Sequence, residues 1–135
     1  MAKGYDQNKE RLNELSLFGK NLARRSGKSC ELCSTSGTGL QVVEVPPIPA
    51  EPEYDRVIFI CETCQTQIKQ PKQIDPNHWR SLSNTMWSEI PAVQVMALRM
   101  LHHLAKTESW ADDLLQQAYV DPEVEAWIDE AEIGG

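Results

Sequence analysis

The sequence predicts an α+β fold: a small four-cysteine zinc finger of two short strands and two knuckles, preceded by one helix and followed by a mainly helical C-terminal region. All four cysteines occur in two pairs of identical spacing, CELC and CETC. Short β-branched segments lie between the pairs, and apolar residues at helical spacing lie on both sides. We divide the 135 residues into a helix at 1–29, a finger at 30–72 and a helical region at 73–135.

The first predicted element is an amphipathic helix over residues 6–26. Asp6 is its expected N-cap, and Gly27 is its expected end because glycine readily adopts the left-handed conformation that closes many helices. An apolar stripe runs along this helix: Leu12, Leu15, Phe18 and Leu22. Lys20 and Arg24 share a face near the C-terminal end, where the helix dipole favours cations.

Two strands are predicted between the cysteine pairs, at residues 41–45 and 56–60, where β-branched residues are concentrated. The segment VPPIPAEPEYD between them carries four prolines. These prolines exclude a helix and favour a stiff extended connection. Gly37 and Gly39 indicate a tight turn after the first cysteine pair.

From Asp75 onward the predicted structure is helical. Asp75-Pro76 and Asp121-Pro122 each place a capping residue before a proline, which is favoured at the first helical position. The segment after Pro91 is apolar on two faces, which is typical of a helix that is central to a core or clamped by a partner. The residues of the predicted apolar faces are Trp79, Leu82 and Met86; Val93, Met96, Met100 and Leu104; Val95, Leu98 and Leu101; Trp110, Leu114 and Tyr119; and Val124, Trp127 and Ile128.

The cysteine spacing predicts one structural Zn²⁺ bound by four thiolates, because a two-residue spacer lets one tight turn present both sulfurs to the same ion. The predicted ligands are Cys30, Cys33, Cys61 and Cys64. The alternative is a redox-active pair at a helix start. Two pairs without a surrounding βαβ pattern favour the metal. Four thiolates on Zn²⁺ leave a net charge of about −2, which Lys28 and Lys69 are placed to offset.

The net charge of −7 is distributed unevenly. Residues 1–29 hold seven basic side chains against three acidic ones, whereas residues 108–135 hold nine acidic side chains and no basic one. Either the basic face contacts nucleic acid locally, or the two ends attract each other within one fold. No apolar run approaches the roughly 18 residues of a membrane helix, and the N-terminus has no continuous apolar segment. We therefore expect a cytoplasmic protein without membrane contact.

The predicted order of knuckle, strand, loop, strand, knuckle and helix resembles the treble-clef finger of HNH endonucleases. Those enzymes carry a histidine at the end of the first strand as general base, and a later histidine that holds the catalytic ion. Here the first strand ends in VVEVPP, Gln65 follows the second knuckle, and all three histidines lie in the helical half. The resemblance therefore implies the scaffold of such a finger without its catalytic histidines.

Glu44, His78 and the His102–His103 pair are the remaining candidates for chemistry. A lone carboxylate on a strand, such as Glu44, is expected to be solvated. His78 is expected to hydrogen-bond the knuckle or a neighbouring loop. His102 and His103 point about 100° apart on a helix, so they are expected to border the core rather than chelate one ion. No catalytic residue is predicted.

Over nearly its full length the chain resembles the proteobacterial PhnA-type proteins, small zinc-ribbon proteins named after a gene of the alkylphosphonate-use operon. The resemblance is carried by MAKGYDQNKERL, CELC, VPPIP, CETC, DPNHW and WSEIPAVQVMALR. It implies a zinc protein of unestablished role, with the four cysteines as ligands and no catalytic residue. It does not extend to the small β domain that follows the ribbon in the better-known members.

The sequence supports three hypotheses of function. The first is a non-enzymatic adaptor that binds a protein partner, with a groove lined by one or two of the four tryptophans, Trp79, Trp87, Trp110 and Trp127. The second is a nucleic-acid-binding finger protein that uses the basic N-terminal side chains Lys20, Arg24, Arg25 and Lys28. The third and least favoured is a hydrolase acting on phosphonates or phosphodiesters, which needs a second metal site.

Overall fold

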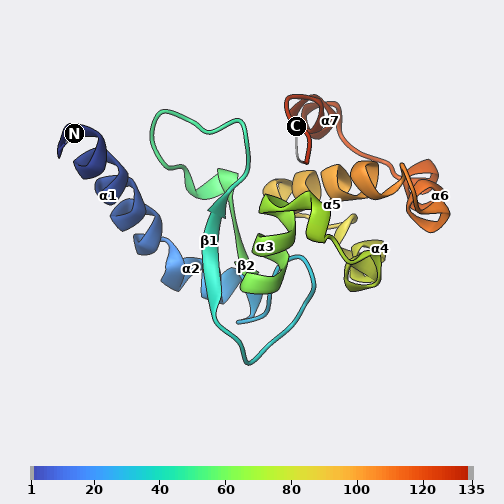
Figure 1. Ribbon diagram of the computed structural model, residues 1–135, viewed down its shortest axis with the longest axis horizontal. Coiled ribbons are helices and arrows are strands. Elements are labelled where there is room, and N and C mark those ends of the chain that lie inside the picture. The colour runs from blue at the N-terminus through green and yellow to red at the C-terminus, as the bar shows by residue number, and fades with distance from the viewer. Residues whose placement is uncertain (1, 134–135) are drawn as a thin grey trace.

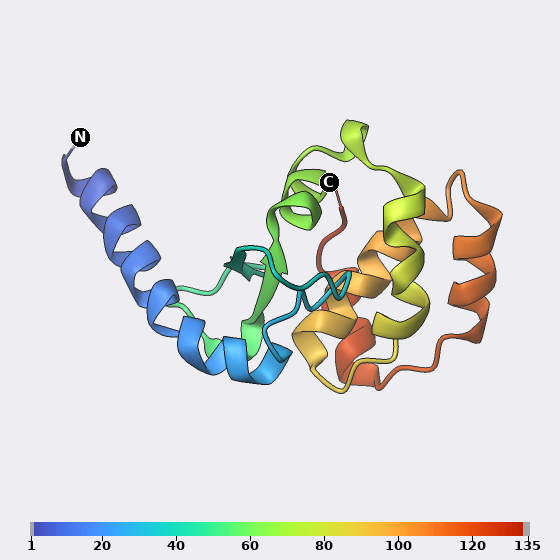
Figure 2. The same ribbon diagram turned by 90° about the horizontal axis from the view of Figure 1, so that it is seen from below.

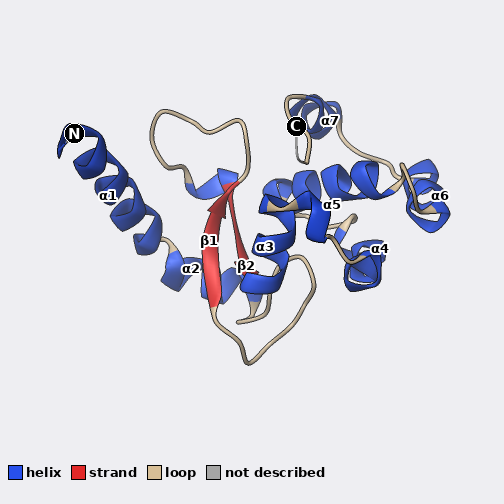
Figure 3. Ribbon diagram, viewed as in Figure 1, coloured by secondary structure: helices blue, strands red, loops and turns tan. Residues whose placement is uncertain are grey.

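The computed structural model of the chain describes residues 2–133, with side chains from residue 9 onward (Figure 1). In this part the structure is mixed α+β, as predicted, with a two-stranded hairpin and mostly helices elsewhere (Figure 3). In chain order, with η for a 3-10 helix, the elements are α1 (Ala2–Leu17), α2 (Gly19–Ser26), β1 (Leu40–Glu44), η1 (Tyr54–Arg56), β2 (Val57–Cys61), α3 (Glu62–Lys69), η2 (Pro71–Gln73), η3 (Pro76–Ser81), α4 (Leu82–Thr85), α5 (Pro91–Leu104), α6 (Ser109–Gln117) and α7 (Pro122–Asp129).

The hairpin separates two hydrophobic cores. Strands β1 and β2 pair antiparallel, with Val42 opposite Phe59. β1 begins and ends one residue earlier than predicted, and β2 one residue later. Successive residues of a strand point to opposite faces, so Ile58 and Ile60 belong to the main core, whereas Val57 belongs to a smaller second core that Phe59 borders. Both faces of the hairpin are therefore covered.

The N-terminal region forms two helices, α1 and α2, where the sequence predicts one over residues 6–26. α1 begins at Ala2, before the predicted cap Asp6, whose side chain lies outside the described part. The helix is interrupted at Phe18, and α1 extends away from the rest of the molecule (Figure 2). α2 ends at Gly27, whose φ of 65° is the left-handed conformation predicted there.

The interruption lets both helices pack on the same face of the hairpin. Leu15 from α1 and Leu22 from α2 are buried together with Val57 in the second core, and Phe18 packs against it. Leu12 is predicted to share this stripe but is 58% exposed. Among the described side chains of α1, Leu15 is the first apolar one that is buried against the hairpin.

Helix α5 is the centre of the main core, as its two apolar faces predict. Ten of its 14 residues are buried, and it packs against β2, η1, α4, α6 and α7. The buried residues include every member of the two predicted faces: Val93, Val95, Met96, Leu98, Met100, Leu101 and Leu104. No helix within residues 2–133 is long and apolar enough to cross a membrane.

The remaining helices differ from the prediction in detail. Asp75 caps as predicted, accepting a hydrogen bond from the backbone N–H of Asn77, but a 3-10 helix follows before α4. Asp121 precedes α7 without a side-chain cap bond. Tyr119 lies beyond the end of α6 and is 85% exposed, so its predicted place on the apolar face of that helix is wrong.

The basic and acidic ends of the chain lie apart. α1 is at one end of the molecule and α6 at the other (Figures 1 and 2). The ion pairs found among the described side chains are Arg11–Glu44, Arg25–Glu31 and Arg56–Glu53. None of these joins the described side chains of residues 9–29 to those of residues 108–133, so the alternative in which the two ends attract each other finds no ion pair in this part of the chain.

Candidate metal centre

The four cysteines meet at one point beside the hairpin. Cys30 and Cys33 lie in the turn that follows α2, Cys61 ends β2 and precedes α3, and Cys64 lies in the first turn of α3. All four Sγ atoms lie within 4.8 Å of one another. The Cys30–Cys64 and Cys33–Cys61 sulfur separations are 3.7 and 3.6 Å, and all four are free thiols. The structure thus brings together all four residues that the sequence singles out.

Two of the six sulfur separations match the edge of a tetrahedral metal site, and the others lie within 4.8 Å. A Zn–S bond of about 2.3 Å gives a tetrahedron with an edge of about 3.8 Å, close to the observed 3.6 and 3.7 Å. Cys30, Cys61 and Cys64 are buried and Cys33 is half-buried. Buried thiolates need a neutralising cation. The cluster therefore has the dimensions, donor type and burial of a structural zinc site.

Without a cation the four thiols cannot all ionise. The hydrogen bond with Cys64 lowers the pKa of Cys30 to about 4. The same bond, together with burial, raises the pKa of Cys64 far above its ordinary range, and burial raises the pKa of Cys61. A divalent cation that takes the place of the protons resolves this conflict, so metal binding at the cluster releases protons.

An ion pair holds the first knuckle against the hairpin. Glu31 follows Cys30, and its carboxylate accepts hydrogen bonds from Nε and Nη2 of Arg25 at 2.8 and 2.7 Å. It also accepts a bond from the backbone N–H of Phe59 at 2.7 Å, and its side chain is only 3% exposed. Arg25 additionally donates to the carbonyl of Val57. Arg25 is thus engaged within the fold, although the sequence places it among the cations for nucleic acid.

Two side chains support the second knuckle. His78 Nε2 lies 3.2 Å from the Sγ of Cys64, so the expected hydrogen bond from this residue to the knuckle is confirmed. Gln67, buried on α3, accepts hydrogen bonds at Oε1 from the backbone N–H of Asp75 and from Nε1 of Trp79, at 2.8 and 2.7 Å. These bonds join α3 to η3. The sequence alone does not single out Gln67, because its partners become neighbours only in the fold.

Glu44 is paired rather than solvated, which corrects the expectation for this residue. Arg11 in α1 donates from Nε and Nη2 to the two carboxylate oxygens of Glu44, at 2.8 and 2.6 Å. Arg11 also donates to the carbonyls of Pro49 and Ala50 in the proline-rich segment. This arrangement clamps α1, the end of β1 and the proline-rich segment together. A carboxylate held in this way is poorly placed to act as a base.

The other candidate positions lie outside the cluster. Gln65 is half-buried on α3, and Lys28 and Lys69 are exposed. His102 is exposed on α5, whereas His103 is half-buried. Of this pair, only His103 borders the core as expected.

Comparison with known proteins adds no relative: no protein-family model, no curated protein and no solved structure matches the chain. The PhnA-type and HNH-like resemblances therefore depend on the quoted motifs alone. The molecule itself presents a four-cysteine cluster in a mixed α+β fold.

Proposed function

We propose that Cys30, Cys33, Cys61 and Cys64 bind one structural Zn²⁺. The observation that carries this proposal is the pair of sulfur separations, 3.7 and 3.6 Å, within a cluster of four free thiols. Four sulfurs complete a tetrahedral coordination sphere and leave no position open for substrate or water. The role of the ion is therefore to stabilise the fold. In small zinc fingers the apparent free energy of zinc binding is roughly 10–16 kcal/mol.

We further propose that this zinc-built fold is a cytoplasmic, non-enzymatic adaptor for a protein partner. The two groups best suited to act as a base are engaged elsewhere, since Glu44 binds Arg11 and His78 contacts Cys64. Cysteines that bind a metal ion as thiolates, and form no disulfide, are suited to a reducing compartment such as the cytoplasm.

Helix α1 offers the partner surface. It exposes two leucines, Leu12 and Leu17, which are 58% and 77% exposed and lie about 140° apart around the helix axis. Among the tryptophans expected to line a groove, Trp79 is fully buried and Trp87, at 48% exposed, is the most accessible. A projecting helix with leucines exposed on two sides suits a partner whose apolar groove encloses α1.

Capture from native lysate with the zinc-loaded chain tests this adaptor role. We expect one stoichiometric partner, which is lost when Leu12→Glu and Leu17→Glu are combined. Asn13→Glu is the matched control, because it adds a charge to an exposed position of the same helix without removing an apolar contact. Recovery of no partner, or undiminished recovery with the double variant, contradicts the proposal.

A second candidate function is nucleic-acid binding through the basic surface of α2. Lys20, Arg24 and Lys28 are exposed there, while Arg25 is held by Glu31. Phosphate contacts make affinity fall steeply with salt. Titration of DNA and RNA at low and high salt, with Lys20→Ala and Arg24→Ala combined, therefore tests this candidate. An absence of binding at low salt removes it.

We also propose a family for the chain. The quoted motifs support a PhnA-type zinc ribbon, and the order of elements from Cys30 to α3 supports a treble-clef finger without HNH histidines.

A phosphonate or phosphodiester hydrolase is the third candidate and needs Glu44 or His78 as its base. Turnover that is lost in Glu44→Gln or His78→Gln supports a hydrolase. Turnover that survives both indicates a contaminant.

A further inference from the structure

The four-cysteine cluster is more open to solvent at Cys33 than at its other members. Cys30, Cys61 and Cys64 are 2%, 4% and 0% exposed, whereas Cys33 is only half-buried. A loop of exposed residues, 34–39, follows Cys33. Oxidation of cysteine depends on thiolate character and on exposure. A small oxidant that approaches the cluster therefore meets Cys33 first.

The sulfur contacts of the cluster run between the two knuckles. Sγ of Cys33 lies 3.6 Å from Sγ of Cys61, and Sγ of Cys30 lies 3.7 Å from Sγ of Cys64. A sulfenic acid condenses with a thiolate beside it to form a disulfide. Cys61 is therefore in position to react with an oxidised Cys33.

We propose that Cys33 is an oxidation site for peroxides and that its oxidation leads to a disulfide with Cys61, which lies in the opposite knuckle. This inference rests on the proposed zinc site. In the first step the Cys33 thiolate attacks one oxygen of the peroxide. The S–O bond forms, the O–O bond breaks, and the leaving oxygen takes up a proton. The Cys61 thiolate then attacks the sulfur of the sulfenic acid, so the S–S bond forms and the second oxygen leaves with a proton as water.

The two steps balance with hydrogen peroxide as the oxidant. Two thiolates lose two electrons to form the disulfide, and one molecule of peroxide is reduced to two molecules of water. Cys30 and Cys64 take up protons and remain as thiols, so no thiolate holds the proposed ion and it is released. Exchange with a dithiol, which is itself oxidised to a disulfide, restores the thiolates.

The Cys33–Cys61 disulfide joins the same two knuckles that the proposed metal ion joins. The two residues are 28 positions apart in the chain, and a cross-link that closes a loop of this length restricts the unfolded chain. A disulfide within CELC or CETC encloses only two residues and leaves the knuckles unconnected. Oxidation across the knuckles therefore releases the ion while it preserves their connection.

Contacts outside the cluster also hold the first knuckle in place. The backbone N–H of Glu31 donates to the carbonyl of Phe59 at 3.0 Å, in addition to the ion pair of its side chain. The hydroxyl of Ser81 donates to the carbonyl of Leu32 at 3.2 Å. These bonds do not involve a cysteine side chain, so they remain when the cluster is oxidised.

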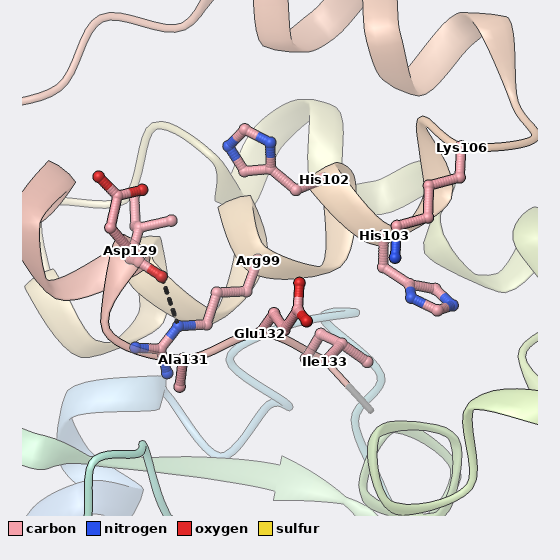
Figure 4. Close-up of a pocket in the computed structure, with 9 residues that line it drawn as sticks. Arg99, His102, His103, Lys106, Asp129, Ala131, Glu132 and Ile133 are labelled. Carbon is pink, nitrogen blue, oxygen red and sulfur yellow. Dashed lines mark hydrogen bonds between the residues drawn. The ribbon is translucent and has the colours of Figure 1, made fainter. Parts of the chain in front are cut away.

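The helical region has supports of its own. Arg99 of α5 points toward the end of α7 and donates to the carbonyls of Trp127 and Ile128 (Figure 4). A cation at this end of a helix is also favoured by the helix dipole. We therefore expect the oxidised chain to retain its helices, and reduction to return it to a zinc-binding state.

Treatment of the full zinc-loaded chain with one equivalent of hydrogen peroxide tests the inference. We expect zinc to pass to a chromophoric chelator while the helical circular dichroism is retained. Mass spectrometry of the alkylated, unreduced chain should find Cys33 linked to Cys61, with Cys30 and Cys64 as free thiols. A disulfide within CELC or CETC, sulfinic acid in place of a disulfide, or loss of the helical signal overturns the inference.

Metal analysis before the treatment separates two kinds of failure. A chain purified without zinc contradicts the proposed zinc site and this inference together. A zinc-loaded chain that keeps its metal in the presence of peroxide contradicts only the oxidation at Cys33.

A variant beside the cluster tests the point of attack. Oγ1 of Thr35 lies 3.1 Å from Sγ of Cys33. A hydroxyl that donates to a thiolate withdraws negative charge from the sulfur, so Thr35→Val should accelerate zinc release by peroxide about fivefold, the factor expected for one lost hydrogen bond. Thr38→Val is the matched control, because it makes the same substitution at an exposed position of the same loop. Equal rates for the two variants contradict the assignment of Cys33.

Discussion

Arg25 and Glu31 join α2 to the first cysteine knuckle through two parallel hydrogen bonds of 2.8 and 2.7 Å. The same carboxylate accepts the backbone N–H of Phe59 in β2. One side chain inside the CELC motif therefore positions two candidate ligands relative to the strand that leads to the other two. The knuckle is placed by this contact as well as by the proposed metal ion.

Replacement of Glu31 by glutamine should destabilise the zinc-loaded chain by about 3 kcal/mol, because it leaves Arg25 partly buried without its counter-ion. Urea unfolding measures this loss. Glu62→Gln is the matched control, since Glu62 occupies the same place in CETC but is exposed. Equal stability of the two variants contradicts the role of Glu31.

His78 should tune the affinity of the cluster for zinc. Its Nε2 lies 3.2 Å from Cys64 Sγ, and removal of such a supporting hydrogen bond typically lowers metal affinity by about 10–100-fold. Competition with a chromophoric chelator should therefore detect weaker binding in His78→Phe. The exposed His102→Phe should retain the affinity of the unmodified chain. Identical affinities for both variants would show that His78 is only a neighbour of the cluster.

Arg11→Ala should loosen α1 without unfolding the main core. Arg11 makes hydrogen bonds to Glu44, Pro49 and Ala50, whereas α5 takes no part in these contacts and is buried in the main core. Amide hydrogen exchange should accelerate in α1 and in the proline-rich segment but not in α5. The control is Lys9→Ala, at an exposed position of the same helix. Unchanged exchange in α1 would mean that its packing at Leu15 alone holds it.

His103 should make the chain less stable as the pH falls. Burial, followed by the charge of Lys106, lowers the pKa of His103 below its ordinary 6.5, although Glu132 opposes the shift. The unfolded chain therefore takes up a proton at a higher pH than the folded chain does. The free energy of unfolding consequently declines as the pH falls through 6.5 and below.

This decline is measured against His103→Gln, which cannot titrate. Protonation of the thiolates of the proposed zinc site should affect both proteins equally, so the difference between them isolates the imidazole. We expect the unmodified chain to lose more stability than the variant between neutral and mildly acidic pH. Parallel losses would contradict the lowered pKa.

Residue spacing and hydrophobic periodicity predict the parts of this fold that depend on neighbouring residues in the sequence. The paired cysteines, the two strands and the buried faces of α5 follow from spacing and periodicity within short segments. The sequence does not predict the interruption at Phe18, because the apolar stripe continues across it. The predicted division into three domains remains a prediction.

The supporting polar contacts could not be predicted in the same way. Arg11 and Glu44 are 33 residues apart in the chain, and nothing in either local sequence marks the other as its partner. Glu31 and Glu62 occupy equivalent places in the two cysteine motifs, yet one is buried in a turn and the other is exposed at a helix start. Tertiary placement decides the role of each carboxylate.

One zinc ion bound by Cys30, Cys33, Cys61 and Cys64 is the central claim, and X-ray absorption at the zinc edge together with metal analysis tests it most directly. We predict one zinc per purified chain, surrounded by four sulfur atoms at about 2.3 Å. A protein purified without metal that shows four titratable thiols, or zinc bound through nitrogen and oxygen, would contradict it.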